Sequence, residues 1–133
     1  MTLTDAGPLI ALLDEGETDH ARCREALEQL RGPLLTTWPA FTEAMYLLGE
    51  AGGWRAQEAL WRLVQRGDLV VDMPRDLGCV AELMAKYESV PMDLADASLV
   101  ALAEERSLRT VFTLDRDFRI YRLPRGKSLR VVP

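Results

Sequence analysis

The chain has 133 residues, of which 48% are hydrophobic and 28% are charged, a balance that is typical of a folded globular protein and excludes a disordered one. Its formal net charge is −5, so the protein as a whole has no basic surface that would attract nucleic acid over long distances. We therefore expect one domain spanning residues 1–133, in which any binding of phosphate depends on local cations.

The first half of the chain alternates between short apolar runs and helical patterns. Asp5-Ala-Gly-Pro predicts a sharp turn from a strand into a helix. The predicted elements are a strand at Met1–Thr4, a helix through Leu9–Leu13, a helix at Thr18–Leu30, a strand at Leu34–Thr37, and helices at Pro39–Gly49 and Trp54–Arg66.

The second half continues the alternation. The predicted elements are a strand at Leu69–Val71, helices at Pro74–Tyr87 and Leu94–Arg106, and strands at Thr110–Leu114 and Leu129–Val132. Short apolar strands that alternate with helices indicate a parallel sheet covered on both faces. The expected fold class is therefore α/β, a three-layer α/β/α sandwich with a central parallel sheet of four to five short strands. In such sheets the functional site lies at the carboxyl ends of the strands.

The cysteines and the first residues of the chain indicate the cellular compartment of the protein. The first residues lack the basic start and the apolar stretch of a secretory signal, and no apolar run approaches the ~20 residues of a membrane span. Cys23 and Cys79 form neither a disulfide framework nor a metal-binding pair. We expect a cytoplasmic protein with no membrane contact, in which both thiols fill the core.

The usual nucleophilic chemistries lack their residues. His20 is the only histidine, and it begins a predicted helix with no nucleophile pattern around it, so a surface or capping role is expected. There is no G-x-S-x-G elbow and no phosphate-binding loop of the GxxxxGK[ST] type. One histidine and two scattered cysteines also match no zinc site.

Acidic residues remain as the candidates for chemistry. Each has a local structural explanation, as a helix cap, a turn former or an acid near a helix start. As a set they occupy strand ends and helix starts that a parallel sheet brings to one edge. The candidates that we expect to meet in one crevice are Asp5, Glu43, Asp96 and Asp115, with Asp93 and Asp117 beside them.

Several carboxylates packed together repel one another and oppose folding unless they are protonated or neutralised. A divalent cation would neutralise them, and ligands that are all oxygen atoms select Mg²⁺ or Mn²⁺. Such an ion could activate a water molecule to attack a phosphodiester without a histidine or a serine. The acids therefore predict a metal-dependent hydrolase.

Four motifs in this order resemble the PIN-domain nucleases, especially the VapC-type toxins. They are Asp5-Ala-Gly-Pro-Leu-Ile, Thr42-Glu43, Pro91-Met-Asp-Leu-Ala-Asp-Ala-Ser and Thr113-Leu-Asp-Arg-Asp-Phe118. The resemblance covers essentially the whole chain. It implies a PIN-like fold and cleavage of single-stranded RNA with Mg²⁺ or Mn²⁺.

The resemblance also implies roles and partners. By position, Asp5, Glu43, Asp96 and Asp115 become the catalytic and metal-binding acids. Asp93 and Asp117 would be neighbours that bind metal directly or through water, and Thr113 would hold a water or a carboxylate. The implied partners are an RNA substrate, a cognate antitoxin protein and a second copy of the chain in a homodimer.

Two other functions stay open. A receiver-type phosphoacceptor domain would use Asp72 after the strand Leu69–Val71, although no lysine follows Thr110–Leu114. A non-catalytic PIN-like module could bind a protein through exposed aromatic residues, for which the candidates are Trp54, Trp61 and Tyr121.

A basic cluster near the end of the sequence has two interpretations. It either contacts substrate phosphates or forms a solvated edge. Its members are Arg116, Arg119, Arg122, Arg125 and Lys127.

Overall fold

Five parallel strands form the centre of the computed structural model, which describes residues 1–133. The strands are β1 (Thr2–Thr4), β2 (Leu34–Thr37), β3 (Leu69–Asp72), β4 (Thr110–Phe112) and β5 (Arg130–Val132). Their order in the sheet is β3-β2-β1-β4-β5, and every neighbouring pair is parallel. β1 therefore lies in the middle, and the residue that follows it lies at the centre of the carboxyl edge.

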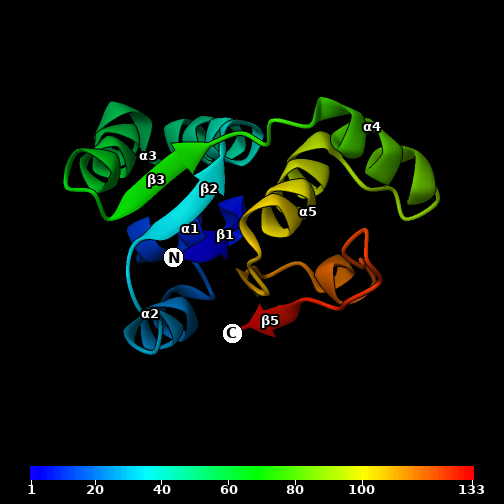
Figure 1. The fold of residues 1–133 in the computed structure, drawn as a ribbon. Coiled ribbons are helices and arrows are strands. Elements are labelled where there is room, and N and C mark those ends of the chain that lie inside the picture. The colour runs from blue at the N-terminus through cyan, green and yellow to red at the C-terminus, as the bar shows by residue number, and fades with distance from the viewer.

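Helices cover both faces of this sheet (Figure 1). They are α1 (Ala6–Leu13), α2 (His20–Glu28), α3 (Trp38–Gln65), α4 (Leu77–Lys86), α5 (Leu94–Arg106) and the short 3₁₀ helix η1 (Arg116–Arg119). One apolar cluster packs α4 and α5 onto the sheet, and a second packs α1, α2 and α3 onto it. The predicted α/β/α sandwich with a parallel sheet is thus confirmed. None of the helices combines the length and the apolar character needed to cross a membrane.

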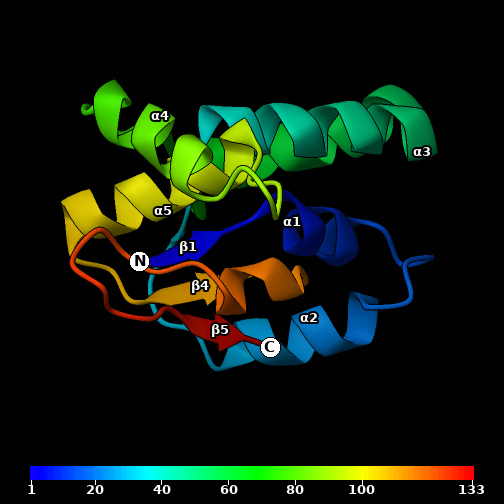
Figure 2. The same ribbon diagram turned by 90° about the vertical axis from the view of Figure 1, so that its right-hand side faces the viewer.

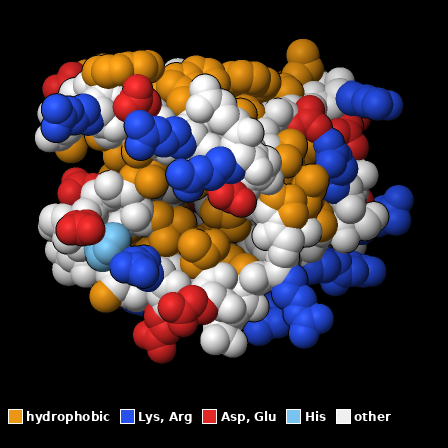
Figure 3. All heavy atoms as spheres, turned by 90° about the vertical axis from the view of Figure 1, so that its left-hand side faces the viewer, with side chains coloured by type: hydrophobic (Ala, Val, Ile, Leu, Met, Phe, Trp, Pro, Cys, Tyr) orange, Lys and Arg blue, Asp and Glu red, His pale blue; other side chains and the backbone are white.

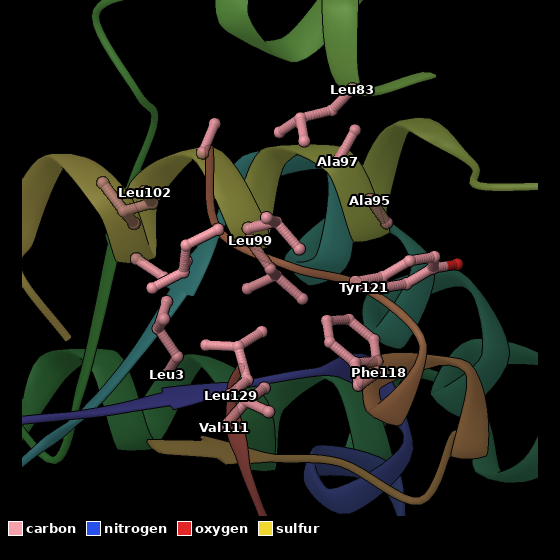
Figure 4. Close-up of a cluster of buried hydrophobic side chains, with 14 of the residues drawn as sticks. Leu3, Leu83, Ala95, Ala97, Leu99, Leu102, Val111, Phe118, Tyr121 and Leu129 are labelled. Atoms are coloured by element: carbon pink, nitrogen blue, oxygen red, sulfur yellow. The ribbon is translucent and has the colours of Figure 1, made fainter. Parts of the chain in front are cut away.

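α5 is the most deeply buried helix, because every residue from 95 to 103 is buried. Figure 4 shows Leu99 and Leu102 of α5 directed toward Leu3 of β1 and Val111 of β4. Burying each such leucine side chain stabilises the fold by roughly 1.5–3 kcal/mol. This packing fixes the helix whose first turn carries Asp96.

α3 runs through the two helices predicted at Pro39–Gly49 and Trp54–Arg66. The predicted break is present within it as a kink, because Gly53 adopts φ 66° and ψ −155° inside the helix. A positive φ is tolerated there because glycine has no Cβ. The Gly-Gly signal therefore marks a bend and not the end of a helix.

Other differences from the predictions include the start of α4, the end of β4 and the segment after β4. α4 begins at Leu77 and not at Pro74, because Asp76 caps the helix by accepting a hydrogen bond from the Cys79 backbone N–H at 3.0 Å. β4 ends at Phe112, two residues before the predicted end. The chain then forms η1, which was not predicted.

The two cysteines are both free thiols. Cys23 is fully buried between α1, α2 and α3, as predicted for a core filler. Cys79 is only partly buried and packs against the edge of the other cluster. The core-filling role is therefore correct for Cys23 and only partly correct for Cys79.

Candidate active site

Acidic side chains from distant parts of the chain line one pocket at the carboxyl edge of the sheet. The pocket has a volume of about 260 Å³. We call it the acid pocket, and its acidic members are Asp5, Glu43, Asp93, Asp96 and Asp115. The fold thus brings the four main candidates and Asp93 together, while Asp117 does not line the pocket.

Asp5 lies at the centre of this pocket because it directly follows β1. Its side chain is 8% exposed. One carboxylate oxygen accepts a hydrogen bond from the Ala6 backbone N–H at 2.8 Å, which caps α1. The other accepts from the Thr113 hydroxyl at 2.9 Å. Both oxygens are therefore held in fixed positions.

Thr113 connects Asp5 to the loop after β4. Besides donating to Asp5, its hydroxyl oxygen accepts a hydrogen bond from the Asp115 backbone N–H at 3.0 Å. Asp115 in turn caps η1, since its carboxylate accepts from the Asp117 backbone N–H at 2.9 Å. Thr113 therefore holds a carboxylate, one of the two roles that the resemblance implied. Asp115 lies on a structured loop and not at the strand end itself.

Asp96 is positioned by an aromatic residue that the sequence analysis assigned to another role. The Tyr121 hydroxyl donates a hydrogen bond to the Asp96 carboxylate at 2.8 Å. Tyr121 is fully buried, and its ring packs edge-on against Phe118 and Tyr87 with centroids 5.2 Å apart in both pairs. Its proposed role as an exposed docking residue is therefore wrong. The available signal was the three-residue spacing of Phe118 and Tyr121, which places both rings on one face of a helical turn.

Asp93 and Glu43 are the exposed members of the pocket. Asp93 caps α5 by accepting a hydrogen bond from the Asp96 backbone N–H at 2.8 Å, so it also has the capping role considered above. Glu43 lies in the second turn of α3. The starts of α3 and α5 are joined by a 2.7 Å hydrogen bond between the Thr37 and Ser98 hydroxyls. This bond helps to fix the spacing between the two helices that carry Glu43 and Asp96.

The electrostatics of the pocket oppose full ionisation. Burial raises the pKa of Asp96 to about 8, even though the hydrogen bond from Tyr121 lowers it. Burial also raises the pKa of Asp5, and the charges of Asp115 and Asp93 add to this rise. The pKa of Glu43 is raised by partial desolvation and by the same neighbouring acids. Without a cation, Asp96 therefore holds a proton near neutral pH.

The donor set of the pocket fits a hard divalent cation. Every candidate ligand is a carboxylate oxygen, with no imidazole or thiolate among the lining groups, and this chemistry suits Mg²⁺ or Mn²⁺. No three His, Cys, Asp or Glu side chains are already arranged as a ligand set in this conformation. Binding an ion would therefore require some of these carboxylates to move closer together.

Asp72 and His20, which the sequence analysis also considered, lie outside the acid pocket. Asp72 is the last residue of β3, an edge strand, and forms an ion pair with Arg106. The phosphoacceptor of a receiver domain would follow a middle strand, so the position of Asp72 argues against a receiver domain. The His20 ring nitrogen Nδ1 lies 2.7 Å from the Ala11 carbonyl oxygen, which joins α2 to α1.

The four arginines of the predicted basic cluster fall into two groups, those with partners within the protein and those without. Arg122 donates to the backbone carbonyl oxygens of residues 119, 120 and 121, and Arg125 forms a 3.1 Å ion pair with Glu104. Both side chains therefore have partners within the protein. Arg116 and Arg119 have none and line a pocket beside the acid pocket.

The comparisons with known proteins cover the segments that carry these acids. The model of the PIN domain family matches residues 2–123. Ribonuclease VapC26 of Mycobacterium tuberculosis is 29% identical over 134 residues, which is 98% of this chain and 99% of that protein.

Solved structures show the same fold. Mycobacterium tuberculosis VapC20, a sarcin-ricin loop cleaving toxin, superposes with a TM-score of 0.83 at 18% identity over 100% of both chains. A chain of a toxin-antitoxin complex from Klebsiella pneumoniae superposes with a TM-score of 0.61 at 21% identity, over 89% of this chain and 90% of that one. The family match includes every acid of the pocket as well as Thr113 and Tyr121.

Proposed function

We propose that this chain, which belongs to the PIN domain family, is an endoribonuclease of the VapC type that cleaves RNA phosphodiester bonds with Mg²⁺ or Mn²⁺. The observation that carries this proposal is the meeting of five acids in one pocket that has no histidine, cysteine or serine among its lining residues. That a single domain spans residues 1–133 remains part of the same proposal.

In this proposal Asp5, Glu43, Asp96 and Asp115 hold the cation, and Asp93 and Asp117 contribute directly or through water. When bound, a divalent cation supplies positive charge that activates a water molecule and offsets the charge that develops on the phosphate. The chain's own residues prepare the ligands. Thr113 and the Ala6 N–H fix the Asp5 oxygens, and Tyr121 fixes one Asp96 oxygen.

Protons are the second part of the proposed chemistry. With a pKa of about 8, Asp96 holds a proton on its carboxyl group at neutral pH when no cation is present. Binding a cation displaces that proton, so we expect metal affinity to rise with pH.

We also propose an antitoxin partner. An apolar groove of about 540 Å³ lies between α1, α2 and the second half of α3, and its apolar residues include Leu12, Leu27 and Leu63. Figure 3 shows an apolar patch near the centre of one face of the molecule, with charged side chains around it. Exposed apolar surface of this kind is typical of binding sites for proteins, and a similar chain from Klebsiella pneumoniae belongs to a toxin-antitoxin complex.

A homodimer is proposed from a different surface. α3 exposes Trp38 (50%) and Tyr46 (64%), and Leu94 at the start of α5 is 49% exposed. Light scattering during size-exclusion chromatography measures the mass in solution. A mass twice that of one chain supports the proposal, and the mass of one chain contradicts it.

We place the active protein in the cytoplasm because a reducing compartment suits its two free thiols.

The non-catalytic binding module keeps some support, because Trp54 and Trp61 are exposed on the second half of α3. One experiment separates it from the enzyme. Single-stranded RNA is incubated with the protein and Mg²⁺ or Mn²⁺, with and without EDTA. Cleavage that EDTA abolishes supports the nuclease, and intact RNA under all conditions supports the module.

Metal binding is tested separately by thermal unfolding. An ion that binds only the folded protein stabilises it by roughly 2.7 kcal/mol at a hundred times its Kd. We therefore expect the unfolding midpoint to rise at millimolar Mn²⁺. An unchanged midpoint would contradict a cation site in the acid pocket.

A further inference from the structure

A second pocket adjoins the acid pocket and has the opposite charge. Its volume is about 220 Å³, and it shares Leu114 and Asp115 with the acid pocket. Its other charged side chains are those of Arg22, Arg116 and Arg119. A phosphate group next to the one in the acid pocket would therefore meet arginines.

A third and larger pocket continues from the second. Its volume is about 640 Å³, and it shares Arg22 and Pro133 with the second pocket. It lies between α2 and the amino ends of β1, β4 and β5, and Figure 2 shows β5 and α2 next to each other below β4. Besides Arg22 it contains Arg31, Arg109 and Arg130, opposed by the single acid Glu25. The three pockets thus connect the acid pocket to the amino edge of the sheet.

We call the six arginines of the second and third pockets the arginine track. Its members are Arg22, Arg31, Arg109, Arg116, Arg119 and Arg130. Only Arg22 forms an ion pair, with Asp19 at 3.6 Å, and that side chain is still 60% exposed. The other five have no ion pair or side-chain hydrogen bond within the protein. In a chain with a net charge of −5, these six exposed arginines in adjoining pockets form a local positive surface that is free to bind an external anion.

We propose that the backbone of single-stranded RNA follows the arginine track from the acid pocket to the amino edge of the sheet. This inference rests on the proposed function. Guanidinium groups bind phosphates through paired hydrogen bonds, and each contact adds salt dependence to binding. The third pocket also has apolar walls that include Leu30 and Leu108, which suits an unstacked base lying against a guanidinium plane. A flexible single strand can bend through three successive small pockets, whereas a stiff duplex cannot.

The test uses the far end of the track, away from the acids. The double variant Arg31→Ala/Arg130→Ala is compared with Arg55→Ala/Arg66→Ala, which removes the same charge from exposed positions in the second half of α3 and at its C-cap. Circular dichroism and thermal unfolding confirm that both variants fold. Binding of a labelled RNA of about 12 nucleotides, within the ~4–16 nucleotides typical of single-strand sites, is measured in EDTA at several salt concentrations. Cleavage of that RNA and of a trinucleotide is measured with Mn²⁺.

We expect the track variant to bind and cleave the long RNA roughly tenfold less well, and the slope of log affinity against log salt to shrink by about 0.7 for each lost phosphate contact. The trinucleotide should be cleaved at the wild-type rate, and the α3 variant should behave as wild type. The proposed RNA path would be contradicted by equal losses of cleavage on both RNAs, by equal losses of binding and cleavage in both variants, or by no loss at all.

The two hypotheses fail in different ways. If the wild-type protein cleaves neither RNA, the proposed nuclease function is wrong. RNA binding in EDTA still tests whether RNA follows the arginine track. If the wild-type protein cleaves RNA and the salt slope of the track variant is unchanged, only the track fails.

Discussion

Burial has opposite effects in the middle of α5 and in its first turn. At Leu99, burial removes apolar surface from water and stabilises the fold. At Asp96, one turn earlier, the same burial opposes the charged form of the carboxyl group and raises its pKa to about 8. The middle of α5 therefore supplies stability that its first turn reduces. A residue of the first kind should affect folding, and a residue of the second kind should affect chemistry.

The largest expected effect is on catalysis. Asp96→Asn and Asp5→Asn keep the side-chain size but remove charge from the proposed cation ligands. Loss of outer partners of metal ligands alone typically costs 10–100-fold, so we expect RNA cleavage to fall by at least roughly a hundredfold. Cleavage rates with Mn²⁺ measure this, alongside circular dichroism to check the fold.

The matched control for these variants is Asp68→Asn, since Asp68 is exposed before β3 at the other edge of the sheet. His20→Gln should also keep near-normal activity because His20 only contacts the Ala11 carbonyl oxygen. Cleavage that survives in both pocket variants would mean that the chemistry belongs to other residues.

The second effect is on stability, in the middle of α5. Leu99→Ala should lower the free energy of unfolding by about 2–5 kcal/mol, because it leaves a cavity in a tightly packed cluster. Urea unfolding measures this change. Cleavage per folded molecule should stay close to wild type. Leu77→Ala, at a side chain that is 61% exposed, should change stability by less than ~0.5 kcal/mol. A greater loss of unfolding free energy from Leu77→Ala than from Leu99→Ala would contradict the role of burial at Leu99.

The third effect concerns Tyr121, which belongs to the same buried cluster as Leu99 and contacts Asp96. Tyr121→Phe keeps the buried ring but removes the hydrogen bond to Asp96, so we expect Mn²⁺ affinity to fall by roughly 10–100-fold. Calorimetric titration of Mn²⁺ without RNA measures the affinity, and saturating Mn²⁺ should restore much of the cleavage. Tyr87→Phe is the control, because the Tyr87 hydroxyl accepts from the Arg122 backbone N–H and not from the site. Equal affinities in the two variants would show that Tyr121 serves packing alone.

The smallest effect is on the pH dependence of the metal-free protein. Below pH 3.8, Asp96 is protonated in both the folded and the unfolded state. Between 3.8 and about 8 only the folded state keeps the proton, so stability falls as pH rises through this window. In EDTA the unfolding midpoint should therefore be higher at pH 6 than at pH 8.5. We expect a difference of at least roughly 3 °C, equivalent to about 1 kcal/mol for a chain of this size. Asp96→Asn should reduce this difference, and a midpoint that rises with pH in the wild-type protein would contradict the raised pKa.

The sheet was predictable because its strands are short apolar runs between helical patterns, and the edge that holds the acids follows from parallel pairing. Asp5 shows this most simply, since a residue directly after a central strand must lie at that edge. The kink at Gly53 was signalled by Gly52-Gly53, but the continuation of α3 depends on packing that no local pattern contains.

Tyr121 and the arginine track were not predictable for a different reason. A tyrosine hydroxyl suits either solvent or a buried carboxylate, and only the path of the chain after η1 places it beside Asp96. The arginines near the end of the sequence were grouped because they are neighbours in the chain. The fold instead gathers Arg22 and Arg31 with Arg109 and Arg130, which come from opposite ends of the sequence.

The hydrogen bond between Thr113 and Asp5 joins residues that are 108 positions apart, and this separation matters during protein synthesis. A ribosome releases the chain from its amino end. β1 therefore cannot pair with β4 until residues 110–112 have emerged. Asp96 has no hydroxyl donor until residue 121 follows. A nascent chain therefore has Asp5 and Glu43 long before it has the loop after β4 that completes the pocket. For the proposed nuclease, we expect chains that end before residue 110 to leave RNA intact.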